Sequence, residues 1–318
     1  MTEVRSFVWS DLPMLRRLAP LGVSLDTVTG LTRGVSPVNA AFMASLPLRD
    51  RGMPTYVLRD NSGGVLGQLR HREGAPDAHI AYIAPSLGER DDRADWLAMI
   101  DGLVIAAGMR GAQSLSAELD PDAPAFEALR EAGFAVLTRQ DIWRRAPAPV
   151  EPSPARLLRP RTTIHMIGVT VLYANTVPRL VQQASPPPQA DEKGLVYLNP
   201  NGHTAGYFTV YAGRQGTLLR ALLHPEAGDR AADLFADALT YLSRVERIPV
   251  YCTVQRYQDW LREPLAAAGF EPWARQVVMV KYTVRGIQYP AFQPLPALEQ
   301  APPVIEMQVA DPHYCEES

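Results

Sequence analysis

Three short sequence patterns occur twice along the chain, in the same order each time. The first copy contains "DNSGGVLGQL" (60–69), "IAPSLGER" (83–90) and "FEALREAGF" (126–134), and the second contains "NPNGHTAGYF" (199–208), "LHPEAGDR" (223–230) and "LREPLAAAGF" (261–270). The offsets between matching positions are similar: 139 from Gly67 to Gly206, 140 from Ile83 to Leu223, and 136 from Gly133 to Gly269. One Gly-Phe match is common by chance, whereas an ordered set of three is not. The sequence therefore predicts one domain written twice, with small changes in loop length.

Each copy also shows the same order of predicted elements. In the first copy, two strands flank an "NSGG" turn, a third strand ends at Pro85, and a helix follows with Trp96, Ile100 and Leu103 on one apolar face. A buried strand, a helix closed by Gly133 and a last strand complete the copy. This pattern predicts an α/β (α+β) protein with a sheet in each copy, and a single continuous sheet would argue against the duplication.

The length of 318 residues is consistent with two domains. A Pro-rich stretch, "APAPVEPSP", lies between the copies, and a second Pro-rich stretch follows the last predicted strand. We therefore expect domains at 1–147 and 155–286, a linker at 148–154 and a tail at 287–318.

The charge pattern argues against several kinds of partner. The net charge is −3 and no Lys/Arg run is present, so we expect neither nucleic acid nor a membrane surface as a partner. The first residues do not resemble a signal peptide, and Cys252 and Cys315 form no CxxC pair, which together favour a cytoplasmic protein. We expect a small-molecule substrate, no metal, and a monomer, because two tandem copies can imitate a dimer within one chain.

The order strand–helices–strands–helix–strand–helix–strand, with a "VxG" turn and a late "LxxxGF", resembles the GNAT superfamily of acyl-CoA N-acyltransferases. The resemblance covers residues 2–145 and 155–285 and implies two tandem GNAT-like domains, each a mixed, mostly antiparallel sheet flanked by helices. It also implies that acetyl-CoA or another acyl-CoA lies in a gap between two splayed strands, the first of which carries a bulge. The pyrophosphate would then sit at the start of the next helix.

The resemblance places the acyl-CoA site on matching residues of the two copies. These residues are Ile83, Ala84, Gly88, Arg90 and Arg93 in the first copy, and Leu223, Gly228 and Arg230 in the second. Two positions of the family's pyrophosphate loop usually hold glycine or another small residue, and in both copies these positions hold larger residues. Acids such as Asp91 and Asp229 lie close by. Because acids also stabilise a helix start, an ordinary helix N-terminus is the alternative interpretation.

Candidates for acid–base chemistry are few. Glu118 ends a predicted strand where the family can place a base, and Tyr82 lies on the predicted cofactor strand. The family's proton-donating Tyr is replaced by Leu129 and Leu265, and Tyr257 is the possible substitute. We expect the single histidines, His79 among them, in turns or at the surface.

Two functions follow from the resemblance. The first is acyl-CoA-dependent N-acyl transfer, with acetyl transfer to an unidentified amine. The alternative is a non-catalytic, GNAT-like ligand-binding or interaction protein, which the altered loops and the replaced Tyr favour. Between the copies, the first is preferred for activity because its N-terminal region is fuller.

Overall fold

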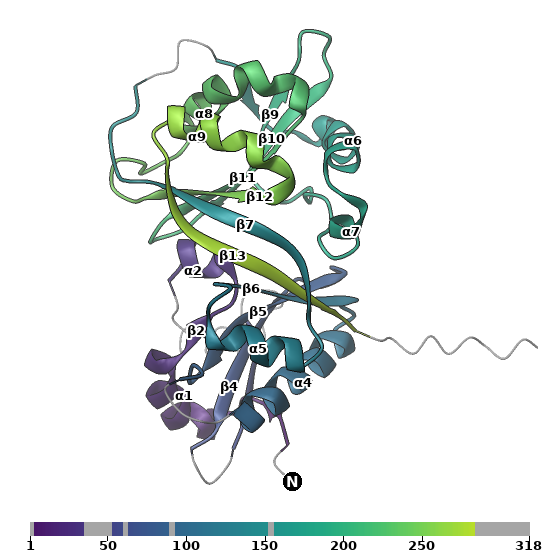
Figure 1. Ribbon diagram of the computed structural model, residues 1–318, viewed down its shortest axis with the longest axis vertical. Coiled ribbons are helices and arrows are strands. Elements are labelled where there is room, and N and C mark those ends of the chain that lie inside the picture. The colour runs from purple at the N-terminus through teal and green to yellow at the C-terminus, as the bar shows by residue number, and fades with distance from the viewer. Residues whose placement is uncertain (1–2, 35–52, 60–62, 89–92, 152–155, 284–318) are drawn as a thin grey trace, which may run out of the picture. The chain divides into compact units, whose positions relative to one another are not determined.

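The computed structural model describes residues 3–34, 53–59, 63–88, 93–151 and 156–283. Within these residues one mixed sheet runs through both copies, in the strand order β1-β3-β4-β5-β6-β13-β7-β12-β11-β10-β9-β8, with β2 attached to β5 (Figure 1). Among the described strands, the pairs β5–β6 and β11–β12 are parallel and the other pairs are antiparallel.

The elements of the first copy follow the predicted order. They are β1 (Arg5–Ser6), η1 (Trp9–Asp11), α1 (Leu12–Leu18), η2 (Ala19–Leu21), β2 (Val23–Ser24), α2 (Thr27–Thr32), β3 (Thr55–Leu58), β4 (Val65–His71), β5 (Asp77–Ala84), α4 (Arg93–Met109), β6 (Ser114–Leu119), α5 (Pro124–Glu131) and β7 (Ala135–Arg145).

Within the described residues, the second copy repeats the order of the strands and α-helices without a counterpart of β2, and the short 3₁₀ helices differ. Its elements are β8 (Leu158–Pro160), η3 (Thr163–His165), α6 (Met166–Thr176), α7 (Arg179–Gln182), β9 (Gly194–Leu198), β10 (Thr204–Ala212), β11 (Thr217–Leu223), η4 (Pro225–Arg230), α8 (Ala231–Thr240), β12 (Val250–Gln255), η5 (Arg256–Leu261), α9 (Arg262–Ala267) and β13 (Glu271–Tyr282). The matching helix ends at Gly133 and Gly269 have φ angles of 85° and 81°, the left-handed geometry that glycine tolerates.

The two copies exchange their last strands. Strand β13 of the second copy pairs with β6 of the first, and β7 of the first copy pairs with β12 of the second. The two exchanged strands also pair with each other along most of their length and run side by side through the middle of the sheet (Figure 1). Each half of the sheet therefore needs a strand from the other half.

This exchange joins the two expected sheets into one, which differs from the expectation of a sheet in each copy. The duplication itself is visible, because the strands counted outward from the exchanged pair correspond: β6-β5-β4-β3-β1 on one side match β12-β11-β10-β9-β8 on the other. All described residues belong to one compact unit, Met1–Val284. The domain boundaries at 147 and 155 stay a prediction.

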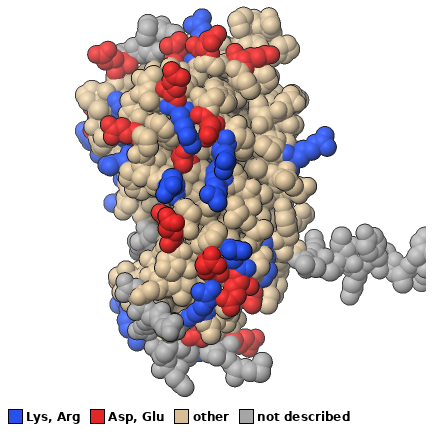
Figure 2. Space-filling view, in the orientation of Figure 1, with Lys and Arg blue, Asp and Glu red and all other residues tan. Residues whose placement is uncertain are grey.

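Helices cover both faces of each half of the sheet in the same way. In the first half, α4 and α5 pack on one face through residues such as Trp96 and Leu129, and α1 packs on the other through Leu15 and Leu18. In the second half, α8 and α9 cover one face and α6 and α7 the other. None of the described helices is both long and apolar enough to cross a membrane. On the face shown in Figure 2, acidic and basic side chains are interspersed.

Candidate functional site: two strand gaps and a pocket

The first strand gap lies between β5 and β6. These strands pair only from Asp77 to His79 on β5, and then separate. Just beyond, β5 carries a bulge, because Gln68 and Leu69 of β4 face Tyr82 and Ile80 and leave one residue extra between them. A bulge followed by a gap is the arrangement that the sequence resemblance implies.

This first gap is filled by the chain itself. Val23 and Ser24 of β2 pair with Ile83 and Tyr82 of β5, so they add a short strand there. The Leu25 N–H donates to the Ala81 carbonyl at 3.2 Å, and the Glu118 N–H donates to the Leu25 carbonyl at 2.8 Å. Residues 23–25 thus form hydrogen bonds with backbone groups on both sides of the gap. We call them the plug.

The plug lies close against β5 because Gly22 precedes it. A side-chain Cβ at Gly22 would overlap the Tyr82 ring and lie 2.6 Å from the Cβ of Ala84. Asp26 follows the plug as the N-cap of α2, where it accepts a hydrogen bond from the Thr29 N–H at 3.0 Å.

The second strand gap lies between β11 and β12, and no strand of the described chain fills it. The last pair in register is Arg220 with Thr253. Ala221, which matches Ala81 in the repeat alignment, accepts a hydrogen bond from the side-chain amide of Gln258 at 3.3 Å. One side chain therefore reaches the carbonyl that a backbone segment reaches in the first copy.

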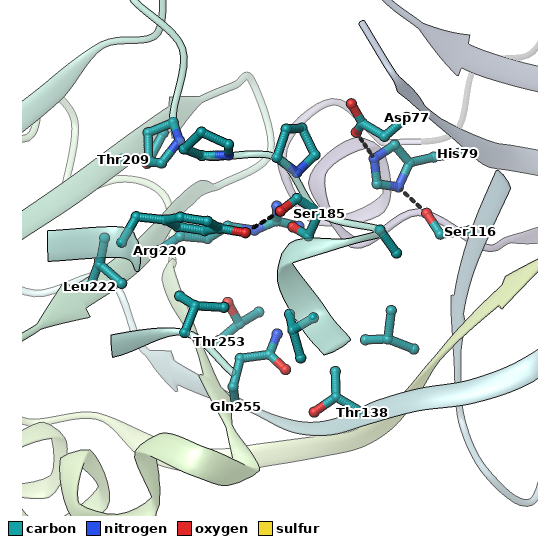
Figure 3. Close-up of a pocket in the computed structure, with 18 of the residues that line it drawn as sticks. Asp77, His79, Ser116, Thr138, Ser185, Thr209, Arg220, Leu222, Thr253 and Gln255 are labelled. Carbon is teal, nitrogen blue, oxygen red and sulfur yellow. Dashed lines mark hydrogen bonds and ion pairs between the residues drawn. The ribbon is translucent and has the colours of Figure 1, made fainter. Parts of the chain in front are cut away.

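A cavity of about 230 Å³ opens from this second gap, and residues of both copies line it. Arg220, Leu222, Thr253 and Gln255 enter it from β11 and β12, while Asp77, His79 and Ser116 enter it from the first copy (Figure 3). Tyr173, Val181 and the Pro186–Pro188 run add a wall from the second copy.

The two residues after the plug, Asp26 and Thr27, bind Arg70 and Glu118, which both line this cavity. Asp26 is fully buried and receives two hydrogen bonds from Arg70, at 2.8 and 2.7 Å. Burial alone would raise the pKa of Asp26, but the charge and hydrogen bonds of Arg70 hold it below its usual range. The Thr27 N–H donates to Glu118 at 2.9 Å, and the other oxygen of Glu118 lies 3.4 Å from Arg220.

His79 joins two other polar groups at the cavity wall. Its Nδ1 lies 2.8 Å from the hydroxyl of Ser116, and its Nε2 lies 3.1 Å from Asp77. Burial would raise the pKa of Asp77, but the hydrogen bond and charge of His79 lower it. His79 lies in β5, and Ser116 of the neighbouring strand β6 forms a hydrogen bond with its ring. The expectation of a turn or surface position for His79 is therefore wrong.

The structure separates the two predicted catalytic residues. Glu118 is 5% exposed and lines the cavity. Tyr82 is not among the cavity's lining residues; it packs against α1, and its hydroxyl donates to the Ala19 carbonyl. Burial raises the pKa of Tyr82 to about 12. Tyr82 keeps its predicted role only as a hypothesis, and its surroundings are those of a core residue.

The predicted cofactor residues of the first copy lie around the plugged gap. Ile83 and Ala84 are fully buried, and Ile83 pairs with Val23. Gly88 has a φ of 102°, and Arg93 begins α4 with an ion pair to Glu131 at 2.7 Å. Arg90 lies outside the described residues.

The predicted cofactor residues of the second copy lie between the open gap and α8. Leu223 is buried at the end of β11. Gly228 lies in η4, where a Cβ would meet no atom within 4 Å, so there is room for close approach. Arg230 precedes α8 and lies 3.7 Å from Asp233 in an exposed pair.

The two positions that correspond to the family's proton donor hold apolar residues, and their surroundings are apolar too. Leu129 and Leu265 are both fully buried in the helix-packed cores. Tyr257 does line the cavity, and burial raises its pKa to about 12, so it stays protonated at neutral pH.

Two arginines at the cavity were not predicted. Arg70 and Arg220 interrupt the strands "VLGQLRH" and "TLLRALL", which otherwise read as ordinary sheet segments. A charged residue inside an apolar strand was the available signal, since charged groups are rarely buried without a partner.

The fold is similar to solved structures although no sequence relationship is detected. No protein-family model and no curated protein matches the chain. A GCN5-related N-acetyltransferase from Sphaerobacter thermophilus matches 88% of this chain and 95% of its own, with a TM-score of 0.58 at 14% identity. A tandem GNAT protein from the clavulanic acid biosynthesis pathway matches 89% and 99%, with a TM-score of 0.54 at 16% identity.

Proposed function

Because this chain has the fold of the GNAT superfamily along both of its copies, we propose that it is an acyl-CoA-dependent N-acyltransferase with one working centre, in its second copy. The donor is acetyl-CoA or another acyl-CoA, and the acceptor is an amine. The proposal moves the site from the first copy, which the sequence favoured, to the second.

The difference between the two strand gaps is the observation that carries this proposal. In the first copy, Leu25 uses its own backbone to bond both Ala81 and Glu118. In the second copy, the matching carbonyl of Ala221 accepts a hydrogen bond from the side chain of Gln258, and no strand of the described residues lies between β11 and β12. A side chain can rotate away from an incoming ligand, whereas a strand paired on both sides must be pulled out of the sheet. The second gap is therefore the one that can accept an extended ligand.

The groups around the cavity suit acyl transfer to an amine. The amine nitrogen attacks the thioester carbonyl carbon, the new C–N bond forms and the C–S bond breaks. Glu118, directly or through water, takes the proton that the amine loses, and Tyr257 gives a proton to the departing thiolate. The open space at Gly228 and the start of α8 would receive the pyrophosphate, with Arg230 beside it.

Calorimetric titration of the full chain with acetyl-CoA, propionyl-CoA and a longer acyl-CoA tests this function. We expect one site per chain, together with a rise in melting temperature, because a ligand that binds only the folded state stabilises it. Two sites per chain would contradict the plugged first copy. No binding of any of the three would contradict the function.

A non-catalytic ligand-binding protein is the second candidate. Its support is the pair of buried leucines, Leu129 and Leu265, at the positions of the family's proton donor. Release of free CoA in the presence of an amine distinguishes the two candidates, because a binding protein would bind acyl-CoA without consuming it.

A further inference from the structure

Arg220 presents unused hydrogen-bond donors to the cavity. Among the described residues, its only hydrogen bond goes to Glu118 at the long distance of 3.4 Å. Its guanidinium carbon lies 5.6 Å from the centre of the Tyr211 ring, and its side chain is 31% exposed. A guanidinium has five N–H donors in a planar fork that matches a carboxylate. The remaining donors are therefore available to an anionic group in the cavity.

Glu118 places an acceptor of the opposite charge next to that fork. One of its oxygens is fixed by the Thr27 N–H at 2.9 Å, and the other faces Arg220. The carboxylate is thus held in position and is only weakly engaged by Arg220. A cation and an anion 3.4 Å apart are complementary to a molecule whose carboxylate and ammonium are joined through one carbon.

Gln255 offers a further acceptor in the same cavity. Its Nε2 donates to Gln140 at 2.7 Å, while its Oε1 is buried and has no hydrogen-bond partner among the described residues. A buried oxygen without a partner is costly, and a ligand N–H would satisfy it.

One part of the cavity wall is apolar, and the cavity is small. Val177, Val181, Ala184 and Leu222 line it, together with the ring of Tyr173. Its volume of about 230 Å³ lies below the roughly 300–1,000 Å³ of cavities that hold drug-sized ligands. This space suits one small molecule with a hydrocarbon side chain better than a peptide.

We propose that the acceptor is a free α-amino acid with an apolar side chain. Its carboxylate binds Arg220, its amino group contacts Glu118, and its side chain points toward Val181 and Leu222. This inference rests on the proposed function for the role of acceptor, but the binding site itself does not depend on acyl transfer.

Calorimetry with three related probes tests the recognition on the unmodified full chain. L-Leucine carries both charged groups, L-leucinamide lacks the carboxylate, and 4-methylpentanoic acid lacks the amine. We expect leucine to bind roughly 10- to 100-fold more tightly than either of the others, because each charged hydrogen bond is lost in turn. Equal affinities for the three, or no leucine binding at millimolar concentrations, would overturn the inference.

Two variants locate the site. Arg220→Gln should weaken leucine binding by the same factor and leave leucinamide binding nearly unchanged. Arg214→Gln is the matched control, since Arg214 is exposed in the turn between β10 and β11. If Arg220→Gln fails to fold, Arg220→Lys keeps the charge and removes the planar fork. Leucine binding that is as strong in the Arg220 variant as in the control would sink the idea.

The outcomes for the two proposals are distinguishable. Acetyl-CoA binding without leucine binding leaves the acyltransferase and removes the amino acid as acceptor. Leucine binding without acyl-CoA binding keeps the amino-acid site and removes the acyltransferase.

Discussion

Gln140 and Gln276 occupy equivalent positions in the two copies, 136 residues apart, and they face each other across β7 and β13. The Gln140 side-chain amide donates to the Gln276 side-chain oxygen at 2.9 Å. Gln255 donates to Gln140, and Thr27 donates to Gln276, so a line of polar side chains crosses the join between the copies. The two copies of the repeat thus contact each other through this pair of equivalent residues.

The Gln140–Gln276 pair should show strong energetic coupling. Gln276→Met leaves the donors of Gln140 and Thr27 without their acceptor, and we expect a loss of about 1–3 kcal/mol in the free energy of unfolding. The double change Gln140→Met, Gln276→Met should cost less than the sum of the single changes. A double-mutant cycle by urea denaturation measures this, and additive effects would show that the pair is not coupled.

Asp26 should be a carboxylate on which stability depends strongly. Asp26→Asn removes the charge partner of Arg70, whose side chain is 32% exposed while Asp26 is buried, and we expect a loss of about 1.5–3 kcal/mol in stability. The control is Asp191→Asn, which breaks an exposed pair with Arg72 and should cost less than about 1 kcal/mol. Similar costs for the two variants would contradict the importance of the Asp26–Arg70 pair.

A change at Gly22 should loosen the plug. Gly22→Ala places a methyl group against the Tyr82 ring, and overpacking of this kind typically costs about 1–3 kcal/mol. Hydrogen exchange followed by mass spectrometry should show faster exchange at Leu25 and Glu118. Gly74→Ala serves as a control, since nothing lies within 4 Å of its Cβ position, although its φ of 79° adds local strain. Unchanged exchange at Leu25 would mean that β2 is not held by this contact.

Removal of the Tyr257 hydroxyl should affect turnover rather than binding. We expect Tyr257→Phe to lower kcat by roughly 10²-fold, the lower end for a proton-transferring group, with little change in acetyl-CoA affinity. Tyr282→Phe is the control, because Tyr282 is 49% exposed at the end of β13. Full activity in Tyr257→Phe would exclude it as the proton donor.

Stability should fall in acid as Asp11 is protonated. Burial would raise the pKa of Asp11, but hydrogen bonds from Arg5, the Val8 N–H and Arg59 lower it to about 2 from 3.8. A depressed pKa in the folded state gives stability that is complete above about pH 4 and is lost as the pH falls toward 2. Urea midpoints at pH 5 and pH 3 should therefore differ less in Asp11→Asn than in the unmodified chain.

The duplicated sequence predicted the kind of fold because it repeats local signals. Gly133 and Gly269 both end helices, and the strands on either side of "NSGG" pair as expected. The exchange of β7 and β13 was not predictable, because alternation of apolar residues shows which face of a strand is buried and not which strand lies beside it.

Neither the plug nor the cavity could be predicted from the sequence, for similar reasons. Val23 and Ser24 form a strand of two residues, too short for any periodicity. The contacts of Asp26 with Arg70, and of Glu118 with Arg220, join residues that are 44 and 102 positions apart. Glu118 was identified as a candidate because it is a carboxylate at a strand end, and its partners come only from the folded chain.

The exchanged strands have a consequence for biosynthesis. Translation delivers β6 long before β13, the strand that finally lies beside it, so β6 lacks its final neighbour while more than a hundred further residues are made. An open edge invites pairing with other chains. The first copy therefore cannot reach its final strand pairing before β13 has been synthesised.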